Sequence, residues 1–174
     1  MVTIAITEAD STISDLLKTT LASKGQRLSR STKNTDADYL LLPKDTHKNC
    51  DILLLHEPRP SQKTQADYIT ILNADANNAT LPYETSLVIT YGLNPLATVT
   101  ASSLPPDSEQ THFLCCLQRS IVTLKGKVIE PQEFPVVLPK AITDIPAAMG
   151  FVSLGLTLSF APEDFRTCFL PFML

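Results

Sequence analysis

The stretch VTIAITEADSTISDLLKTTLASKG, residues 2–25, decides the class of fold. Its β-branched start predicts a strand over residues 2–6. Farther along, apolar residues recur at the spacing of one helix face, at Ile13, Leu16, Leu17 and Leu21. Asp10 or Ser11 is suited to cap this helix, and Gly25 stands where the residue after a helix is often glycine. A strand, a polar turn and a helix are the first half of a βαβ unit.

Further apolar runs along the chain predict more strands. Those of the first half are short and nearly continuous, at residues 39–42, 52–55, 68–72 and 87–91. Continuous runs suit strands that are buried on both faces of a parallel sheet. Shorter runs follow at residues 98–102, 112–115, 120–124, 128–129 and 134–138. With Gly126 at a hairpin turn, they indicate a small antiparallel section.

The end of the chain is predicted to be helical. Asp144 is a good N-cap and Pro146 falls in the first turn of a helix that runs to Ser159. A second helix is expected to begin at 161–164, where proline and two acids stand together.

The sequence therefore predicts one α/β domain over residues 1–174, a three-layer sandwich with two C-terminal helices. Residues 1–96 form a mostly parallel, P-loop- or Rossmann-like sheet. Residues 97–140 form the antiparallel β part, and residues 141–174 the helical end.

Composition excludes several classes of protein. The 174 residues are 44% hydrophobic and 18% charged, with a net charge of −4, which is typical of one globular domain and not of a disordered chain. A pI of about 5.3 argues against a nucleic-acid partner bound by charge alone. No run approaches the roughly 18 apolar residues of a membrane span. The first residues lack the pattern of a signal peptide, so we expect a cytoplasmic protein.

Cysteine and histidine give no sign of a metal centre. The cysteines form no C-x-x-C pair and stand at Cys50, Cys115, Cys116 and Cys168. The histidines are scattered, at His47, His56 and His112. We predict reduced thiols that behave as small apolar residues.

Two blocks of sequence resemble the central domain of the Mur ligases, which join amino acids to UDP-muramyl precursors with ATP. The first is Ile4-Ala-Ile-Thr7 with Ser14-Asp-Leu-Leu17, where the family's strand enters T-G-T-N-G-K-T-T and then a helix. The second is Asn73-Ala-Asp75 with Leu87-Val-Ile-Thr-Tyr-Gly92 and Ala97-Thr-Val-Thr-Ala101. It is similar to the family's N-A-D-D, V-V-T-Y-G and A-D-V-x-A segments.

A third block, residues 145–169, is similar to the family's Ala- and Leu-rich helix and the G-I-x-P-E-x-I-x-x-A-L helix after it. Pro162-Glu-Asp-Phe165 carries this match. The blocks follow the family's order and span nearly the whole chain. The chain therefore resembles a stand-alone central domain, without the family's UDP-binding and amino-acid-binding domains.

The resemblance implies an ATP site, but the atoms that hold phosphate are missing. A P-loop needs glycines for close approach and a lysine for the β- and γ-phosphates. Here Thr7 is followed by Glu8-Ala-Asp-Ser-Thr-Ile13, without either, and its two acids would repel a triphosphate. Thr7, Asp10, Ser11 and Thr12 are predicted to be a vestigial nucleotide or anion loop, and an ordinary capped turn is the alternative.

Other family positions have also changed. Glu57, after a buried strand, fits the family's metal-binding Glu loosely, and a solvated loop acid is the alternative. The short stretch between Glu57 and Asn73 leaves no room for the insert that carries the active-site lysine. The family's G-x-H-N stretch and adenine-binding Asn are not kept, at Ala141, Thr143, Asp144 and Ala147.

We predict that the ancestral chemistry is lost. The chain is expected to be a non-catalytic, Mur-ligase-like pseudoenzyme without a cofactor, acting in protein interaction or regulation and linked to cell-wall precursor synthesis. The uncharged end, Phe169–Leu174, predicts a protein partner or a homo-oligomer, and the alternative is a tail packed on its own domain. Two other functions stay open: an ATP- and Mg-dependent amide-bond ligase with a rearranged loop, and a binder of a small anionic ligand at residues 7–12.

Overall fold

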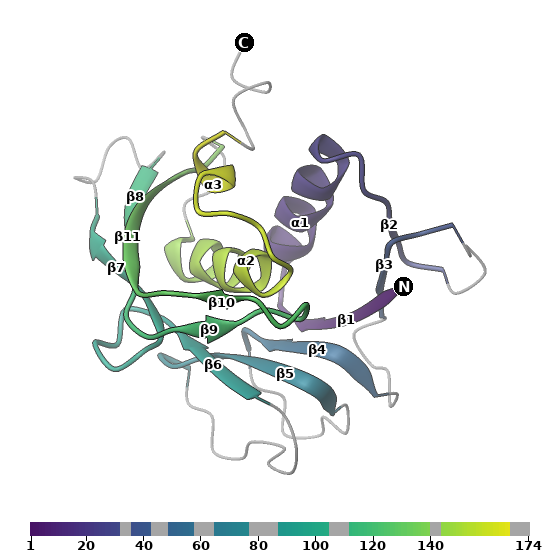
Figure 1. Ribbon diagram of the computed structural model, residues 1–174, viewed down its shortest axis with the longest axis horizontal. Helices are drawn as coiled ribbons and strands as arrows, with labels where there is room; N and C mark the ends of the chain where they lie inside the picture. The colour runs from purple at the N-terminus through teal and green to yellow at the C-terminus, as the bar shows by residue number, and fades with distance from the viewer. Residues whose placement is uncertain are drawn as a thin grey trace.

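A nine-stranded sheet forms the frame of the protein (Figure 1). The computed structural model describes residues 1–31, 36–42, 49–57, 65–76, 87–104, 112–139 and 144–167. The sheet order is β11-β8-β7-β6-β5-β4-β1-β3-β2. Its strands are β1 (Val2–Thr7), β2 (Leu28–Ser29), β3 (Tyr39–Leu41), β4 (Cys50–Leu55), β5 (Ala66–Asn73), β6 (Leu87–Tyr91), β7 (Val99–Ser103), β8 (His112–Leu117) and β11 (Gln132–Val137). The helices are α1 (Thr12–Ser23), α2 (Ile145–Thr157) and the short α3 (Asp164–Thr167).

The strands of the sheet are parallel as far as β7, and the first antiparallel pair is β7 with β8. Strands β2 to β6 are parallel to their neighbours, and β7 joins β6 in parallel through the pair Tyr91 and Val99. β7 and β8, and then β8 and β11, are antiparallel. The mostly parallel α/β fold is confirmed, and these antiparallel strands continue the main sheet. A separate hairpin of β9 (Ile121–Val122) and β10 (Val128–Ile129) turns at Gly126, whose φ is +77°.

Both faces of β3, β4 and the second half of β5 are buried, as their continuous apolar runs predict. β6 differs from this prediction, because Leu87 and Val88 are about half exposed. In β4, Ile52 and Leu54 belong to the large cluster that includes the helices, whereas Leu53 and Leu55 belong to a smaller cluster on the other face. The smaller cluster contains Ala5, Leu40, Leu42, Cys50, Leu53, Leu55, Ala66 and Leu72. The described helices lie on the face of the large cluster (Figure 1).

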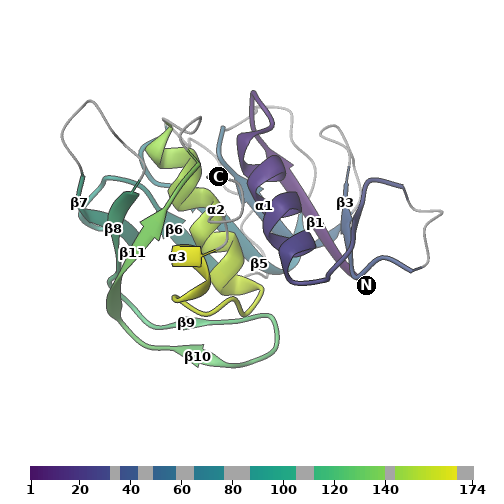
Figure 2. The same cartoon turned by 90° about the horizontal axis from the view of Figure 1, so that it is seen from above.

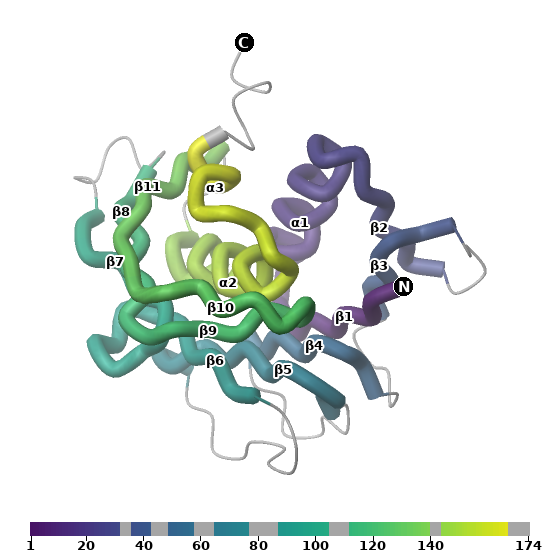
Figure 3. Tube along the Cα trace, viewed as in Figure 1, coloured from purple at the N-terminus to yellow at the C-terminus, as the bar shows by residue number. Residues whose placement is uncertain are grey.

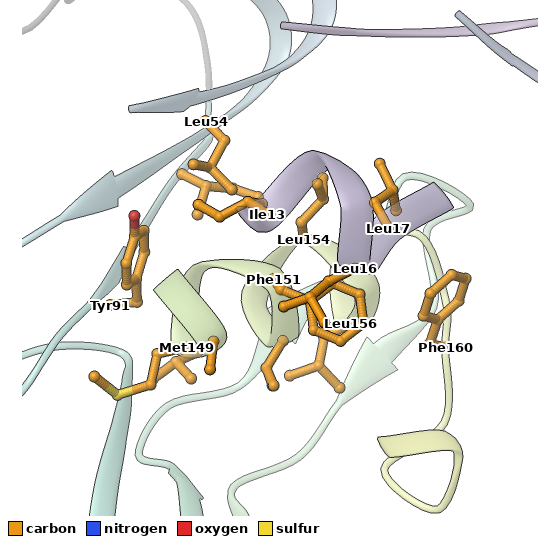
Figure 4. Close-up of a cluster of buried hydrophobic side chains, with 14 of the residues drawn as sticks. Ile13, Leu16, Leu17, Leu54, Tyr91, Met149, Phe151, Leu154, Leu156 and Phe160 are labelled. Carbon is orange, nitrogen blue, oxygen red and sulfur yellow. The ribbon is translucent and has the colours of Figure 1, made fainter. Parts of the chain in front are cut away.

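The central packing contact is between α1 and α2, which lie side by side over the sheet (Figure 2). Ile13 and Leu17 of α1 meet the apolar side chains of α2, such as Leu154 (Figure 4). Every residue of α2 from Ala147 to Thr157 is buried. The β9–β10 hairpin passes the carboxyl end of α2 (Figures 2 and 3), where the Leu124 N–H donates to the Thr157 carbonyl at 2.9 Å. None of the helices in the described ranges is long and apolar enough to cross a membrane.

Both long helices end in the same way. After α1, Gly25 has a φ of +69°, its N–H donates to Ala22, and the Gln26 N–H donates to Leu21. This is the glycine-terminated end that the sequence predicts. After α2, the equivalent position is Ser159, with a φ of +71°. A side chain is disfavoured at such a φ, and the buried Ser159 hydroxyl has no hydrogen-bond partner among the residues that the structure describes.

Some predictions lie outside the described residues. These are the apolar end Phe169–Leu174, Cys168, and the family positions Ala141 and Thr143. The other three cysteines are free, as predicted, and burial raises the pKa of Cys50 to about 12. A thiol with so high a pKa is unreactive near neutral pH.

We expect opposite effects from glycine exchange at the two helix ends. Ser159→Gly should stabilise the protein by about 0.5–1 kcal/mol, because it relieves the left-handed backbone and removes a buried hydroxyl. Gly25→Ala should destabilise it by about 1 kcal/mol, since no atom of the described residues lies within 4 Å of an added Cβ and the cost is in the backbone alone. Urea unfolding of both variants measures the difference. Equal effects of one sign would contradict this account of the helix ends.

Candidate functional site

The first turn of α1 is closed by the carboxylate of Glu8. Glu8 follows β1 directly and is only 2% exposed. It accepts hydrogen bonds from the N–H of Ile13 at 2.8 Å and of Ser14 at 3.3 Å. The Ser14 hydroxyl also donates to it. A negative group at this position is stabilised by the positive end of the helix dipole.

The predicted loop residues surround this carboxylate but do not form an open cradle. Asp10 accepts from the N–H of Thr12 at 3.0 Å. Ser11 stands at the N-cap position but its side chain makes no capping bond, so of the two predicted capping residues Asp10 bonds the first turn and Ser11 does not. Thr7 is buried and its hydroxyl donates to the Leu54 carbonyl at 3.4 Å. Its own carbonyl accepts two N–H groups from the turn after β4.

Each N–H group of the first turn therefore has an acceptor within the chain. Thr12 donates to Asp10, Ile13 and Ser14 donate to Glu8, and the Asp15 N–H makes the first bond to the Ser11 carbonyl. These are the groups that a helix start leaves for phosphate in a nucleotide-binding loop. Here the acceptors are two carboxylates of the loop itself.

A second polar cluster lies at the carboxyl ends of β4, β5 and β6. The ring nitrogen Nδ1 of His56 is 2.8 Å from the hydroxyl of Tyr91, and its Nε2 is 3.9 Å from Asp144 Oδ2. The Asn73 side-chain amide donates to the His56 carbonyl at 3.2 Å. Asp144 also caps α2 through the Ala147 N–H at 2.9 Å, as predicted. These side chains hold one another and the start of α2.

Tyr91 is the most deeply buried member of the cluster, with no exposed surface. Burial raises its pKa far above the ordinary value, and the charges of Asp144 and Glu8 raise it further. Its ring lies against Gly150, where an added Cβ would come within 3.0 Å of it. Tyr91 is therefore a neutral hydrogen-bonding group, and it cannot act as an exposed nucleophile.

Asp75 fixes the loop after β6. Its carboxylate accepts from the N–H groups of Leu93 at 2.5 Å and Asn94 at 2.9 Å. An added Cβ at Gly92 would meet this carboxylate at 2.5 Å, so the close approach requires glycine here. The Asn73 and Asp75 that carry the resemblance thus have structural partners.

The metal-site candidate Glu57 is exposed in the turn after β4. Its N–H donates to the Thr7 carbonyl at 3.1 Å, which ties this turn to the end of β1. Among the described residues, no three His, Cys, Asp or Glu side chains are grouped to hold a metal ion. Within those ranges, Glu57 therefore has no second and third ligand beside it.

Sequence reasoning missed the capping role of Glu8 and the contact between His56 and Tyr91. One signal was available for both. Glu8 and His56 each follow a buried strand directly, and Tyr91 ends another. Because the carboxyl ends of parallel strands meet at one edge of a sheet, residues at these positions come together there.

Comparison with known proteins adds a likeness of fold. No family model and no curated protein matches the sequence. A solved UDP-N-acetylmuramoyl-L-alanyl-D-glutamate–2,6-diaminopimelate ligase has 12% sequence identity and a TM-score of 0.55, over 99% of this chain and 46% of that one. The UDP-N-acetylmuramate–alanine ligase of Thermotoga maritima has 12% identity and a TM-score of 0.52, over 94% of this chain and 43% of that one. The chain thus has a Mur-ligase-like fold and spans less than half the length of these enzymes.

Removing the charge of Glu8 should lower the free energy of unfolding of the protein. We expect Glu8→Gln to destabilise the protein by about 2 kcal/mol, because an amide NH₂ would then face donor N–H groups in a buried place. The control is Asp15→Asn, which removes an exposed acid from the same turn and should change stability by less than about 0.5 kcal/mol. Urea unfolding measures both. A Glu8→Gln effect as small as that of the control would show that the carboxylate is not needed as a cap.

Tyr91 should make the free energy of unfolding depend on pH in alkaline solution. Its folded-state pKa lies above the ordinary 10.0, so above pH 10 the unfolded chain loses this proton and the folded chain keeps it. The stabilisation is complete below pH 10 and falls as the pH rises. Between pH 8 and pH 11 the unaltered protein should lose about 1.4 kcal/mol more stability than Tyr91→Phe. Parallel stability profiles for the two proteins would contradict this.

Proposed function

We propose that this chain is a non-catalytic Mur-ligase-like domain, in which Glu8 takes the place that nucleotide phosphate has in an active relative. In this proposal the domain acts in the cytoplasm by binding a partner protein of cell-wall precursor synthesis, or a second copy of itself. The likeness of fold to two cell-wall ligases supports the link to that process. Because fold alone does not give function, the proposal depends on the site.

The buried carboxylate of Glu8 at the start of α1 is the observation that carries the proposal. A phosphate could reach the N–H groups of Ile13 and Ser14 only by displacing this carboxylate. If both anions stayed, two unit charges about 4 Å apart would repel by about 4 kcal/mol at an effective dielectric constant of 20. That repulsion corresponds to roughly a thousandfold loss of affinity. The loop from Glu8 to Ile13 contains no lysine that would offset it.

The second polar cluster supports the same proposal. A catalytic edge needs polar groups that are open to the substrate. Here His56 is bonded to Tyr91 and lies close to Asp144, and Asp144 caps α2. These side chains are used to join the strands to the helix. We therefore assign them a structural role.

The case for a protein partner comes from the sequence. The final residues, Phe169–Leu174, carry no charge and contain two phenylalanines. Apolar surface of this kind marks protein contacts when it is exposed.

Titration with Mg·ATP tests the proposal. We expect no heat in calorimetry and no rise in melting temperature at about 1 mM nucleotide, with an active Mur ligase measured in parallel as the positive control. Micromolar affinity would stabilise the chain by about 2.7 kcal/mol at a hundredfold excess over Kd. Such binding would overturn the proposal in favour of a nucleotide-dependent function. ADP release in the presence of an amino acid would favour the ligase alternative.

A further inference from the structure

A pocket of about 400 Å³ opens on the β3 side of β1, next to the first turn of α1. It is lined by Ile6, Glu8, Ser11, Ser14, Arg30, Leu41 and Leu42. Ligands of α/β proteins commonly bind at this edge of the sheet, outside the carboxyl ends of the strands. The volume is within the range of small-molecule sites. His56 and Tyr91 lie on the other side of β1, so the pocket is separate from their cluster.

One part of the pocket wall is apolar. Ile6, Leu41 and Leu42 contribute it, and each of them is less than one-tenth exposed. They come from the ends of β1 and β3, two neighbouring strands of the sheet. Such a wall favours a ligand with a hydrocarbon body, which gains free energy by leaving water.

The cationic part of the pocket is Arg30. It follows β2 directly and is exposed. Within the part of the chain that the structure describes, no hydrogen bond or ion pair involves its guanidinium. A guanidinium fits a carboxylate with two parallel hydrogen bonds. The hydroxyl of Ser11 adds a donor nearby, whereas that of Ser14 already donates to Glu8.

The charges in the pocket favour a monoanion over a phosphate. Glu8 lies on the wall, and its carboxylate is held by the N–H groups of α1. A dianionic phosphate would meet this carboxylate and would have one guanidinium to neutralise it. A single carboxylate is matched by Arg30 alone and can lie away from Glu8.

We propose that this pocket binds a small organic monocarboxylate with an apolar body, whose carboxylate pairs with Arg30 at the mouth and whose body lies on Ile6, Leu41 and Leu42. This site shares Glu8 and Ser11 with the anion loop predicted at residues 7–12, but its cation and its apolar wall lie outside that loop. It goes beyond the proposed non-catalytic role, and Mg·ATP titration does not test it.

A set of three related probes tests the ligand class on the unaltered protein. Phenylacetate carries the ring and the carboxylate, phenethyl alcohol carries a neutral hydroxyl in its place, and phenethylamine carries a cation. We expect phenylacetate to bind with a Kd on the order of 0.1–1 mM in an NMR titration. The alcohol and the amine should bind at least about tenfold more weakly. Inorganic phosphate should bind no better than the alcohol.

Two variants test the role of Arg30. Arg30→Gln should weaken phenylacetate binding about tenfold and leave the weaker binding of the alcohol unchanged. Arg27→Gln is the matched control, because Arg27 is exposed on the same segment but does not line the pocket. It should bind phenylacetate like the unaltered protein. Equal affinity for phenylacetate and the alcohol, no saturable binding, or full binding by Arg30→Gln would each overturn the proposal.

Discussion

The contact between the Glu8 carboxylate and the first turn of α1 fixes how the central helix meets the central strand. Glu8 begins the loop that leaves β1, and β1 lies between β4 and β3 in the sheet. By accepting the N–H groups of Ile13 and Ser14, Glu8 sets the start of α1 directly over the carboxyl end of β1. From there, α1 carries its apolar face onto α2, and both helices pack with side chains of the sheet in the large core.

The same contact decides what this edge of the sheet can bind. A helix start placed after a strand is a general site for anions. In this chain the anion is the buried carboxylate of Glu8. An external phosphate would therefore have to displace a group that is covalently part of the protein and always present at the site. At the neighbouring strand ends, the polar groups of His56, Tyr91 and Asn73 are likewise hydrogen-bonded to one another. The pocket that we propose for a carboxylate ligand lies on the β3 side of β1, where Arg30 borders a partly apolar wall.

Local patterns predicted most of the elements, and the sequence was least informative about contacts between them. The strand at 2–7, the helix with Gly25 behind it and the Asp144 cap all depend on neighbouring residues, which a sequence displays directly. The two-residue strand β2 is too short to show a pattern. The contact between His56 and Tyr91 joins residues 35 positions apart, so it depends on the strand order. Glu8 was recognised as a charge that repels phosphate, but capping rules point to the N-cap residue and not to a side chain that reaches back from an earlier position.

The most direct test of the central claim follows the backbone amides of Ile13 and Ser14 by NMR while Mg·ATP is added. If the Glu8 carboxylate holds these N–H groups, both amide protons should resonate downfield of ordinary helical positions and should not move at millimolar nucleotide. A saturable shift of both amides would mean that phosphate displaces the carboxylate. That result would contradict the account of a nucleotide site closed by the chain itself.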